Sequence, residues 1–205
     1  HMFVNSCEKY EEKIAFVYKV GEQEFEVTYQ KFFDDVLLLS RELRAKKITK
    51  NSKVMFVCDN RYEWIVTDFA ILSLGAISIP RGSDTPTPEL EYIMRHSKCE
   101  FLIMENEPIY KQHEEMLKDM DLKSIFILEA ESVHTFFGNT YSYIDLLKDK
   151  KIYNDDIEEF KKLRDNIDED DTFTLIYTSG TTGVPKGVIL THKNIMYNVR
   201  ELPEI

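Results

Sequence analysis

Between residues 54 and 128, short uninterrupted apolar runs alternate with segments of helical periodicity. The runs cover residues 54–58, 76–80, 101–104 and 124–128, and the helical segments between them cover residues 62–74, 88–96 and 109–120. A run that is apolar throughout is typical of a strand buried on both faces, and a helix between two such strands forms a right-handed βαβ unit. The sequence therefore predicts an α/β fold, with a doubly wound, mostly parallel sheet and helices on both faces. Thr87 is placed to cap the second of these helices, because Pro88 follows it.

The segment before this repeat has a different pattern. Two β-prone runs, residues 14–20 and 24–28, are separated by a Gly-Glu-Gln turn and predict a hairpin. A helix is predicted over residues 29–46 because apolar side chains recur there at steps of three and four. Its buried face is expected to consist of Phe32, Phe33, Val36, Leu37, Ser40 and Leu43.

The segment after the repeat begins with a polar stretch, residues 129–171. We interpret its acidic end, residues 155–171, as a solvated helix and loop rather than a metal site. A last unit then follows, with a strand over residues 173–177, a second strand over residues 187–191, and a helix that starts near His192.

Composition excludes several classes of function. The 205 residues include 26 Lys and Arg against 37 Asp and Glu, so the net charge of −11 offers no positive field for nucleic acid. The longest apolar stretch, residues 69–80, is too short for a membrane helix, which needs about 20 residues; this leaves peripheral membrane contact open. Cys7, Cys58 and Cys99 fit neither a zinc site nor a disulfide framework, which is typical of a reduced, cytoplasmic protein. We expect Cys58 and Cys99 to be buried thiols, because they lie inside or beside apolar runs.

The chemistry is concentrated in residues 177–187, which read Tyr-Thr-Ser-Gly-Thr-Thr-Gly-Val-Pro-Lys-Gly. Glycines let the backbone approach a ligand, turn N–H groups and hydroxyls donate to oxyanions, and Lys186 adds a compact positive charge. The loop therefore predicts binding of a polyphosphate rather than a flexible connection alone. It is not a Walker loop, because Pro185 and Gly187 occupy the places of the second glycine and the hydroxyl residue.

Residues 178–187 resemble the ATP-phosphate loop of the adenylate-forming, or AMP-binding, superfamily, which includes the acyl-CoA synthetases. Residues 27–29 (Val-Thr-Tyr) resemble the family's first core motif, and residues 72–80 resemble its second. Residues 80–84 (Pro-Arg-Gly-Ser-Asp) and 198–204 look most like bacterial long-chain fatty-acid–CoA ligases.

The resemblance implies an enzyme that uses ATP with Mg²⁺ to convert a long-chain carboxylic acid into an acyl-adenylate, and coenzyme A to form the thioester. It assigns Lys186 a catalytic role, because its charge would stabilise the leaving pyrophosphate. The expected ATP-phosphate ligands are Thr178, Ser179, Gly180, Thr181, Thr182, Gly183 and Lys186. No metal ligand is assigned within this chain. The expected partners are the acid, ATP and coenzyme A, without nucleic acid.

The resemblance covers only the family's N-terminal part. We interpret His1-Met2 as a remnant of cloning, and residues 3–205 as the N-terminal portion of the large AMP-binding domain, without the mobile C-terminal domain. The chain alone is therefore expected to be inactive, and self-association through its uncovered face is expected. Two alternatives stay open: an adenylation enzyme that loads a carrier protein, and a non-catalytic fragment that binds nucleotide or a partner.

Some conspicuous residues are not assigned to the chemistry. His192 is interpreted as a helix-start or packing residue rather than a base. Arg81 and Asp84 are expected to form an ion pair that shapes a strand-to-helix turn. The aromatic side chains at helical spacing, interpreted as core or interface residues, are Tyr62, Trp64 and Phe69.

Overall fold

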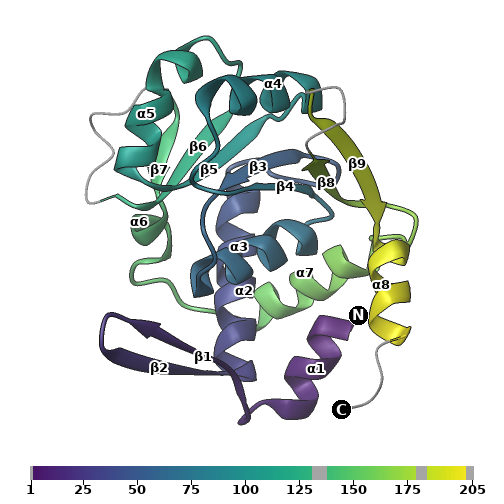
Figure 1. The fold of residues 1–205 in the computed structure, drawn as a ribbon. Helices are drawn as coiled ribbons and strands as arrows, with labels where there is room; N and C mark the ends of the chain where they lie inside the picture. The colour runs from purple at the N-terminus through teal and green to yellow at the C-terminus, as the bar shows by residue number, and fades with distance from the viewer. Residues whose placement is uncertain (1, 131–137, 179–183, 202–205) are drawn as a thin grey trace.

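The computed structural model describes residues 2–130, 138–178 and 184–201. Its centre is a seven-stranded sheet in the order β7-β6-β5-β3-β4-β8-β9, with helices on both faces (Figure 1). The strands are β3 (Lys53–Val57), β4 (Ile77–Arg81), β5 (Phe101–Asn106), β6 (Ser124–Glu129), β7 (Thr140–Ser142), β8 (Thr172–Thr178) and β9 (Lys186–Thr191). Every neighbouring pair is parallel except β8 and β9, which are antiparallel. The predicted α/β fold is confirmed.

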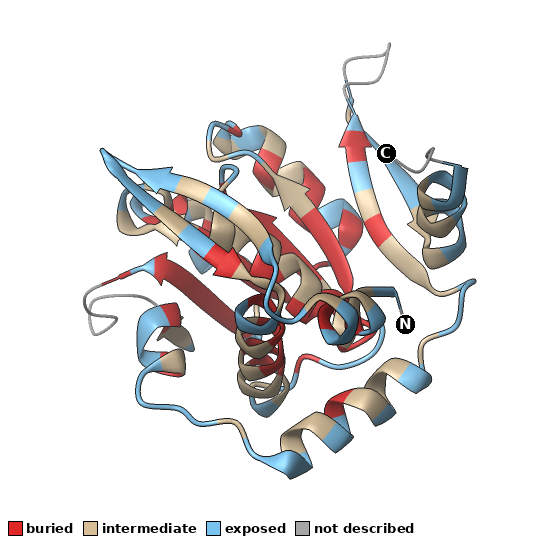
Figure 2. Cartoon of the chain, turned by 90° about the horizontal axis from the view of Figure 1, so that it is seen from below, coloured by how far each residue is buried: buried red, intermediate tan, exposed pale blue. Residues whose placement is uncertain are grey.

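Side chains that alternate along each central strand enter two different cores. Val54 and Phe56 of β3 belong to one core, and Met55 and Val57 belong to the other. Figure 2 shows the central strands buried between their covering helices, whereas the edge strand β9 is exposed along most of its length. The first core is covered by α1 (Met2–Tyr10), α2 (Tyr29–Ala45), α3 (Tyr62–Ser73), α6 (Tyr143–Leu147) and α7 (Asn154–Asp165), and the second by α4 (Thr87–Ser97) and α5 (Glu107–Lys118). Continuous apolar runs were required because both faces of these strands are covered.

The N-terminal hairpin lies outside this sheet. Strands β1 (Ile14–Val20) and β2 (Gln23–Thr28) pair antiparallel as a separate two-stranded sheet, as predicted. Helix α2 starts directly after it, where the Thr28 hydroxyl accepts a hydrogen bond from the Lys31 backbone N–H at 3.2 Å. All six residues expected on the buried face of this helix are buried.

The aromatic residues at helical spacing are half-buried and pack against the first core, in agreement with their interpretation as core or interface residues. The Trp64 ring stacks on Phe56 with centroids 5.9 Å apart, and Phe69 packs edge-on against Phe32 at 5.3 Å. Tyr62 is also in this core and donates its hydroxyl to Asp35 Oδ2 at 2.8 Å.

The prediction that Thr87 caps α4 is wrong. Pro86 occupies the cap position, and its carbonyl accepts the first helical hydrogen bond from Leu90 N–H at 2.9 Å. Thr87 is the first residue of the helix, and its hydroxyl lies 2.9 Å from Nδ1 of the buried His113 on α5. A contact between two helices therefore takes the hydroxyl that sequence reasoning assigned to the helix end.

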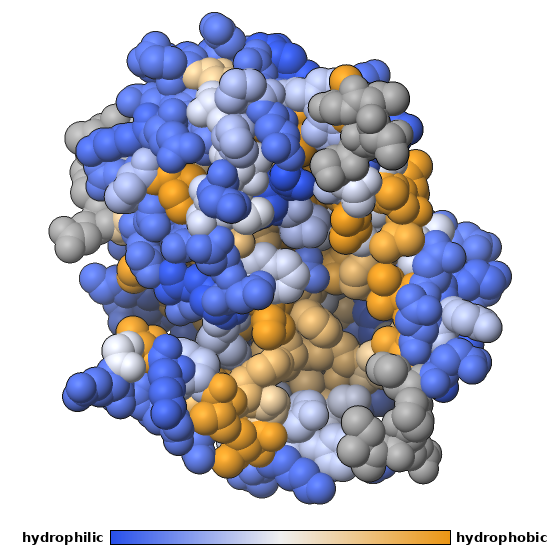
Figure 3. Space-filling model, in the orientation of Figure 1, coloured by the Kyte–Doolittle hydropathy of each residue, from blue (hydrophilic) through white to orange (hydrophobic). Residues whose placement is uncertain are grey.

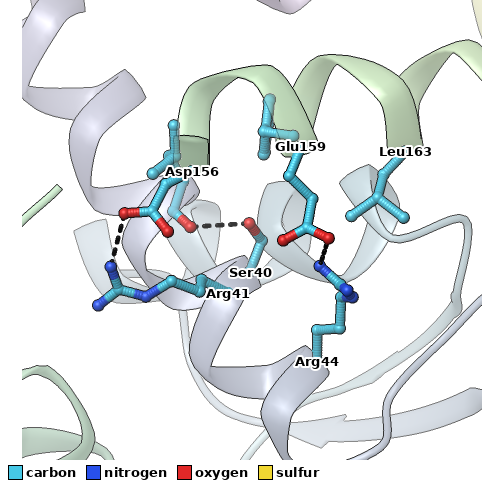
Figure 4. A pocket seen from close by; sticks show the side chains of 8 residues that line it. Ser40, Arg41, Arg44, Asp156, Glu159 and Leu163 are labelled. Atoms are coloured by element: carbon cyan, nitrogen blue, oxygen red, sulfur yellow. Dashed lines mark hydrogen bonds and ion pairs between the residues drawn. The ribbon is translucent and has the colours of Figure 1, made fainter. Parts of the chain in front are cut away.

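The acidic segment forms α7, and its carboxylates are structural. Asp156 lies 2.8 Å from Arg41 Nη1, and Glu159 lies 2.5 Å from Arg44 Nη1, so α7 is tied to α2 (Figure 4). The cavity beside these ion pairs measures only about 10 Å³, a volume that holds at most one water molecule. Within the described ranges, no group of three or more His, Cys, Asp or Glu could hold a metal ion.

The three cysteines are free and buried, which confirms the expectation for Cys58 and Cys99, whereas burial of Cys7 was not predicted. Burial raises the pKa of Cys7 to about 11 and that of Cys99 to about 12, and it also raises the pKa of Cys58. These thiols therefore remain protonated at neutral pH. No helix in the described part of the chain is long and apolar enough to span a bilayer.

Candidate functional site

The two described ends of the predicted phosphate loop meet at the carboxyl edge of the sheet. Thr178 ends β8 and Lys186 begins β9, and the two are register partners in the antiparallel pair. Both side chains are exposed. Ligands of open α/β sheets bind outside the carboxyl ends of the strands, which is the edge where these residues lie. The remaining predicted phosphate ligands, Ser179, Gly180, Thr181, Thr182 and Gly183, lie outside the described residues.

Tyr177, the residue before the loop, is fixed by its ring. The side chain is buried against the core under α4, and its hydroxyl lies 2.7 Å from His96 Nδ1. The two rings are also edge-on, at 5.7 Å and 89°. Burial raises the pKa of Tyr177, so the phenol remains neutral and available for this hydrogen bond.

Gly187 is favoured by the same ring. A Cβ at this position would lie 3.0 Å from Cζ of Tyr177, which is too close for an ordinary contact. Since the Tyr177 ring is held by His96, it has little room to move away. Sequence reasoning treated Gly187 as a backbone spacer for a ligand, and the described contact adds a packing reason for it.

Arg81 also lies at this edge, and sequence reasoning did not place it in the site. Its Nη1 donates to the carbonyl oxygen of Tyr177 at 3.1 Å, and its Nη2 forms an ion pair with Glu89 of α4. The expected ion pair with Asp84 is therefore wrong. The Asp84 carboxylate instead packs over Gly82, where an added Cβ would lie 2.8 Å from Oδ1. Sequence spacing favoured the near carboxylate, whereas the helical turn brings the more distant one to the guanidinium.

The turn that carries Arg81 is fastened to neighbouring strands by carboxylates. Ser83 N–H donates to Asp59 Oδ1 at 3.0 Å, and Asp59 N–H donates to Glu105 Oε2 at 2.8 Å. The hydrogen bonds from Ser83 lower the pKa of Asp59, so this carboxylate stays ionised. A chain of carboxylate-to-backbone bonds thus links the ends of β5 and β3 to the turn after β4.

His192 lies away from this edge, at the start of α8 (His192–Glu201). Its ring packs edge-on against Phe173 at 5.0 Å and 77°. Its Nε2 is buried and has no hydrogen-bond partner among the residues the structure describes, and burial lowers the pKa of His192. A neutral, packed imidazole agrees with the interpretation that His192 is not a base.

A larger hollow lies at the opposite end of β8 from Thr178. It measures about 370 Å³ and is bounded by α1, α3, α7, the start of β8 and α8. Figure 3 shows hydrophobic side chains gathered in this hollow beside α8. Its apolar lining includes Phe3, Phe69, Leu72, Phe173, Ile195 and Met196. The hollow is separated from the phosphate loop by the length of β8.

Comparison with known proteins defines the class. Residues 3–204 match the AMP-binding enzyme family, and the chain belongs to this family. It is 29% identical, over 97% of its length, to long-chain-fatty-acid–acyl-carrier-protein ligase AEE15 of Arabidopsis thaliana, a chloroplastic protein. It is 28% identical, over 75% of its length, to long-chain-fatty-acid–CoA ligase FadD15 of Mycobacterium tuberculosis.

A solved structure shows the same fold. A mutant form of coronafacic acid ligase from Pectobacterium brasiliense aligns with 98% of the chain at a TM-score of 0.77 and 17% identity, a likeness that shows the fold alone. The chain spans 28%, 24% and 38% of the lengths of these three proteins.

Proposed function

We propose that residues 3–205 are the N-terminal portion of the large domain of an ATP-dependent ligase that activates a long-chain fatty acid. In the first step, a carboxylate oxygen attacks the α-phosphorus of ATP, the bond to the bridging oxygen breaks, and pyrophosphate leaves. In the second step, the thiol of coenzyme A displaces AMP from the acyl-adenylate and forms the thioester. The proposal concerns a longer protein, since the chain spans 28% and 24% of its two ligase relatives.

The observation that carries the proposal is the pairing of Thr178 with Lys186 at the carboxyl edge of β8. Pyrophosphate gains negative charge as it leaves, and a fixed ammonium and hydroxyl donors near that charge would lower the barrier. Lys186 is the described cation of this loop, and we propose that it acts there. We propose the same phosphate-binding role for Thr178, for Ser179, Gly180, Thr181 and Thr182, and for the backbone at Gly183.

Mg²⁺ enters this proposal as part of the Mg–ATP substrate. The described residues contain no group of His, Cys, Asp or Glu suited to hold the ion. We assign it no ligand among the described residues. Two carboxylates at this edge of the sheet, Asp59 and Glu89, are engaged by Ser83 N–H and by Arg81 respectively.

The acceptor of the acyl group has two candidates. Coenzyme A is supported by the name of the Mycobacterium tuberculosis relative, and an acyl carrier protein is supported by that of the Arabidopsis thaliana relative. Both names refer to long-chain fatty acids, which supports the proposed substrate class. The buried free cysteines support a reducing compartment, and we propose the cytoplasm, although the plant relative is chloroplastic.

Exchange of labelled pyrophosphate into ATP, measured on the complete protein with carboxylic acids of graded chain length, tests the first step. We expect exchange that depends on the acid and is fastest with long chains. Consumption of coenzyme A, compared with acylation of a phosphopantetheinylated carrier protein, then identifies the acceptor. ATP binding without exchange for any acid would contradict the enzyme and leave the non-catalytic alternative.

A further inference from the structure

We propose that Arg81 is a positioning residue of the phosphate loop, and that it acts through the carbonyl of Tyr177. This inference rests on the proposed function, because it concerns how the same loop is oriented for ATP. Arg81 is not assigned a contact with substrate. Its side chain is only 19% exposed, and two of its nitrogens already have protein partners.

The guanidinium joins three elements at one point. Arg81 is the last residue of β4, Glu89 lies in the first turn of α4, and Tyr177 is the last residue but one of β8. Nη1 donates to the Tyr177 carbonyl oxygen at 3.1 Å while Nη2 pairs with Glu89. Nε is buried and has no hydrogen-bond partner among the described residues. Glu89 thus fixes the orientation of the guanidinium group that donates to the Tyr177 carbonyl.

Arg81 provides a link that the backbone of β4 lacks. The recorded register between β4 and β8 consists of the pair Ser78 and Thr174, which is strengthened by a hydrogen bond from Thr174 Oγ1 to Ser78 O at 2.8 Å. Two residues further along β4 is Pro80, which has no N–H to donate. Beyond that point, the Arg81 side chain reaches the carbonyl of Tyr177 instead. The Arg81 side chain therefore adds an attachment between β4 and the loop-bearing end of β8, beyond the register pair Ser78 and Thr174.

Holding this carbonyl orients the first peptide of the loop. The carbonyl of Tyr177 and the N–H of Thr178 belong to one planar peptide, so fixing the oxygen also fixes the direction of the N–H. The Tyr177 ring is fixed separately, by the hydrogen bond to His96 of α4 at 2.7 Å. Helix α4 therefore supports both the backbone and the side chain of the residue from which the loop starts.

An arginine is needed for this arrangement. A guanidinium is a planar fork that can donate in two fixed directions at once, whereas an ammonium is a point charge on a flexible stem. A lysine at position 81 could keep the ion pair with Glu89 but would not hold the Tyr177 carbonyl with the same geometry. Arg81→Lys thus keeps the positive charge at position 81 and removes the hydrogen bond that positions the Tyr177 carbonyl.

Arg61 provides a matched control at the same edge. It follows β3, its side chain is 27% exposed, and it pairs with Glu63 and Glu129 at 2.8 and 2.6 Å. Its recorded partners lie on α3 and β6, away from β8. Substitution of Arg61 therefore removes ion pairs of a similar kind without affecting the carbonyl of Tyr177.

The test measures steady-state adenylation by the complete protein, as pyrophosphate release, together with the melting temperature. We expect Arg81→Gln and Arg81→Lys to raise the KM for ATP about tenfold, the scale of one lost charge-assisted hydrogen bond, and to leave the KM for the acid unchanged. Glu89→Gln should raise the KM for ATP by less, because the guanidinium of Arg81 remains and only its ion pair with residue 89 is lost. Arg61→Gln should leave both KM values unchanged even if it lowers the melting temperature.

An unchanged KM for ATP in Arg81→Lys and Glu89→Gln would overturn the inference, as would an equal rise in Arg61→Gln. Should Arg81→Gln not fold, Arg81→Lys and Glu89→Gln still decide. Lys186→Ala is measured in parallel to separate the two proposals. A rate that is lost in Lys186→Ala while the Arg81 variants behave as wild type contradicts the positioning role alone, whereas an unchanged rate in Lys186→Ala contradicts the proposed function as well.

Discussion

Lys186 is the residue on which the proposed chemistry depends most directly. It is exposed and opposite Thr178, so its removal should cost charge stabilisation without disturbing a core. In the complete protein, we expect Lys186→Ala to lower acid-dependent pyrophosphate release by about 10²–10³-fold. Lys193→Ala is the matched control, because Lys193 is also exposed but pairs with Glu169, at 3.0 Å. Equal rates in the two variants would show that the loop is misassigned.

His113 predicts a pH dependence of stability. The side chain is fully buried, Nδ1 lies 2.9 Å from the Thr87 hydroxyl, and burial lowers the pKa of His113. The folded state therefore holds a neutral imidazole, whereas the unfolded chain takes up a proton below its ordinary pKa of about 6.5. The contribution of this group is fully present above that pH and is lost as the pH falls from there through the lowered pKa of the folded state.

The variant His113→Gln tests this sign. Glutamine does not titrate and can still hydrogen-bond to Thr87. We expect the free energy of unfolding, measured with urea between pH 5 and 7.5, to fall less steeply on acidification in the variant than in the wild type. Parallel pH profiles for the two proteins would contradict the assignment.

At the scale of elements, the start of α2 depends on Thr28. Its hydroxyl accepts from Lys31 N–H, and the helix then buries six apolar side chains in the first core. We expect Thr28→Ala to lower the free energy of unfolding by about 1 kcal/mol, the usual cost of a lost cap. Thr28→Ser should retain most of it because the hydroxyl remains. A loss in Thr28→Ser as large as in Thr28→Ala would show that the methyl group, not the cap, is responsible.

Elements with a strong periodic pattern were predictable, and short or context-dependent ones were not. The helix over α2 and the strands β3 to β6 follow from apolar spacing, which is a local property of the sequence. The three-residue strand β7 and the five-residue α6 are too short for such a pattern and owe their conformation to pairing with β6 and packing on the first core. Helix α1 was not predicted either, although it buries Val4 and Cys7.

At the scale of the whole molecule, the two cores predict that the 205-residue chain folds on its own. We expect a cooperative urea transition but no measurable thioester formation, because the proposed reaction needs several catalytic parts together and we propose only the phosphate-binding loop for this chain. Affinity for Mg–ATP should be weak, since one loop must offset the cost of its own ordering. Calorimetric titration with Mg–ATP and an assay for AMP check both points. Micromolar binding or acid-dependent AMP would contradict them.

The uncovered edge of the sheet predicts self-association of this chain. Ile189 on β9 is 63% exposed, and Val188 and Ile176 beside it are also exposed. Apolar surface next to the open outer edge of a strand favours contact between copies. We expect sedimentation to show concentration-dependent association that Ile189→Lys suppresses. Ile144→Lys is the control, because Ile144 is 56% exposed on α6, away from this edge. Equal association in the two variants would contradict the assignment of the edge.

The sequence by itself determined the class of fold and the place in the chain of the loop that we propose binds phosphate. Apolar runs between amphipathic helices specify parallel βαβ units, because both faces of each strand must be buried. A loop with hydroxyls, glycines and Lys186 directly after such a strand then has to lie at the carboxyl edge of the sheet. Both conclusions follow from residues that lie close together in the sequence.

Only the tertiary structure decided which strands lie side by side and which partners the charged groups take. The sheet order places β4 next to β8, so Arg81 contacts the carbonyl of Tyr177, 96 positions along the chain. The same packing pairs Arg81 with Glu89 rather than Asp84, and gives the hydroxyl of Thr87 to His113 rather than to a helix end. The physical reason is that apolar periodicity fixes which face of an element is buried, whereas strand order and side-chain partners depend on the packing of segments far apart in the chain.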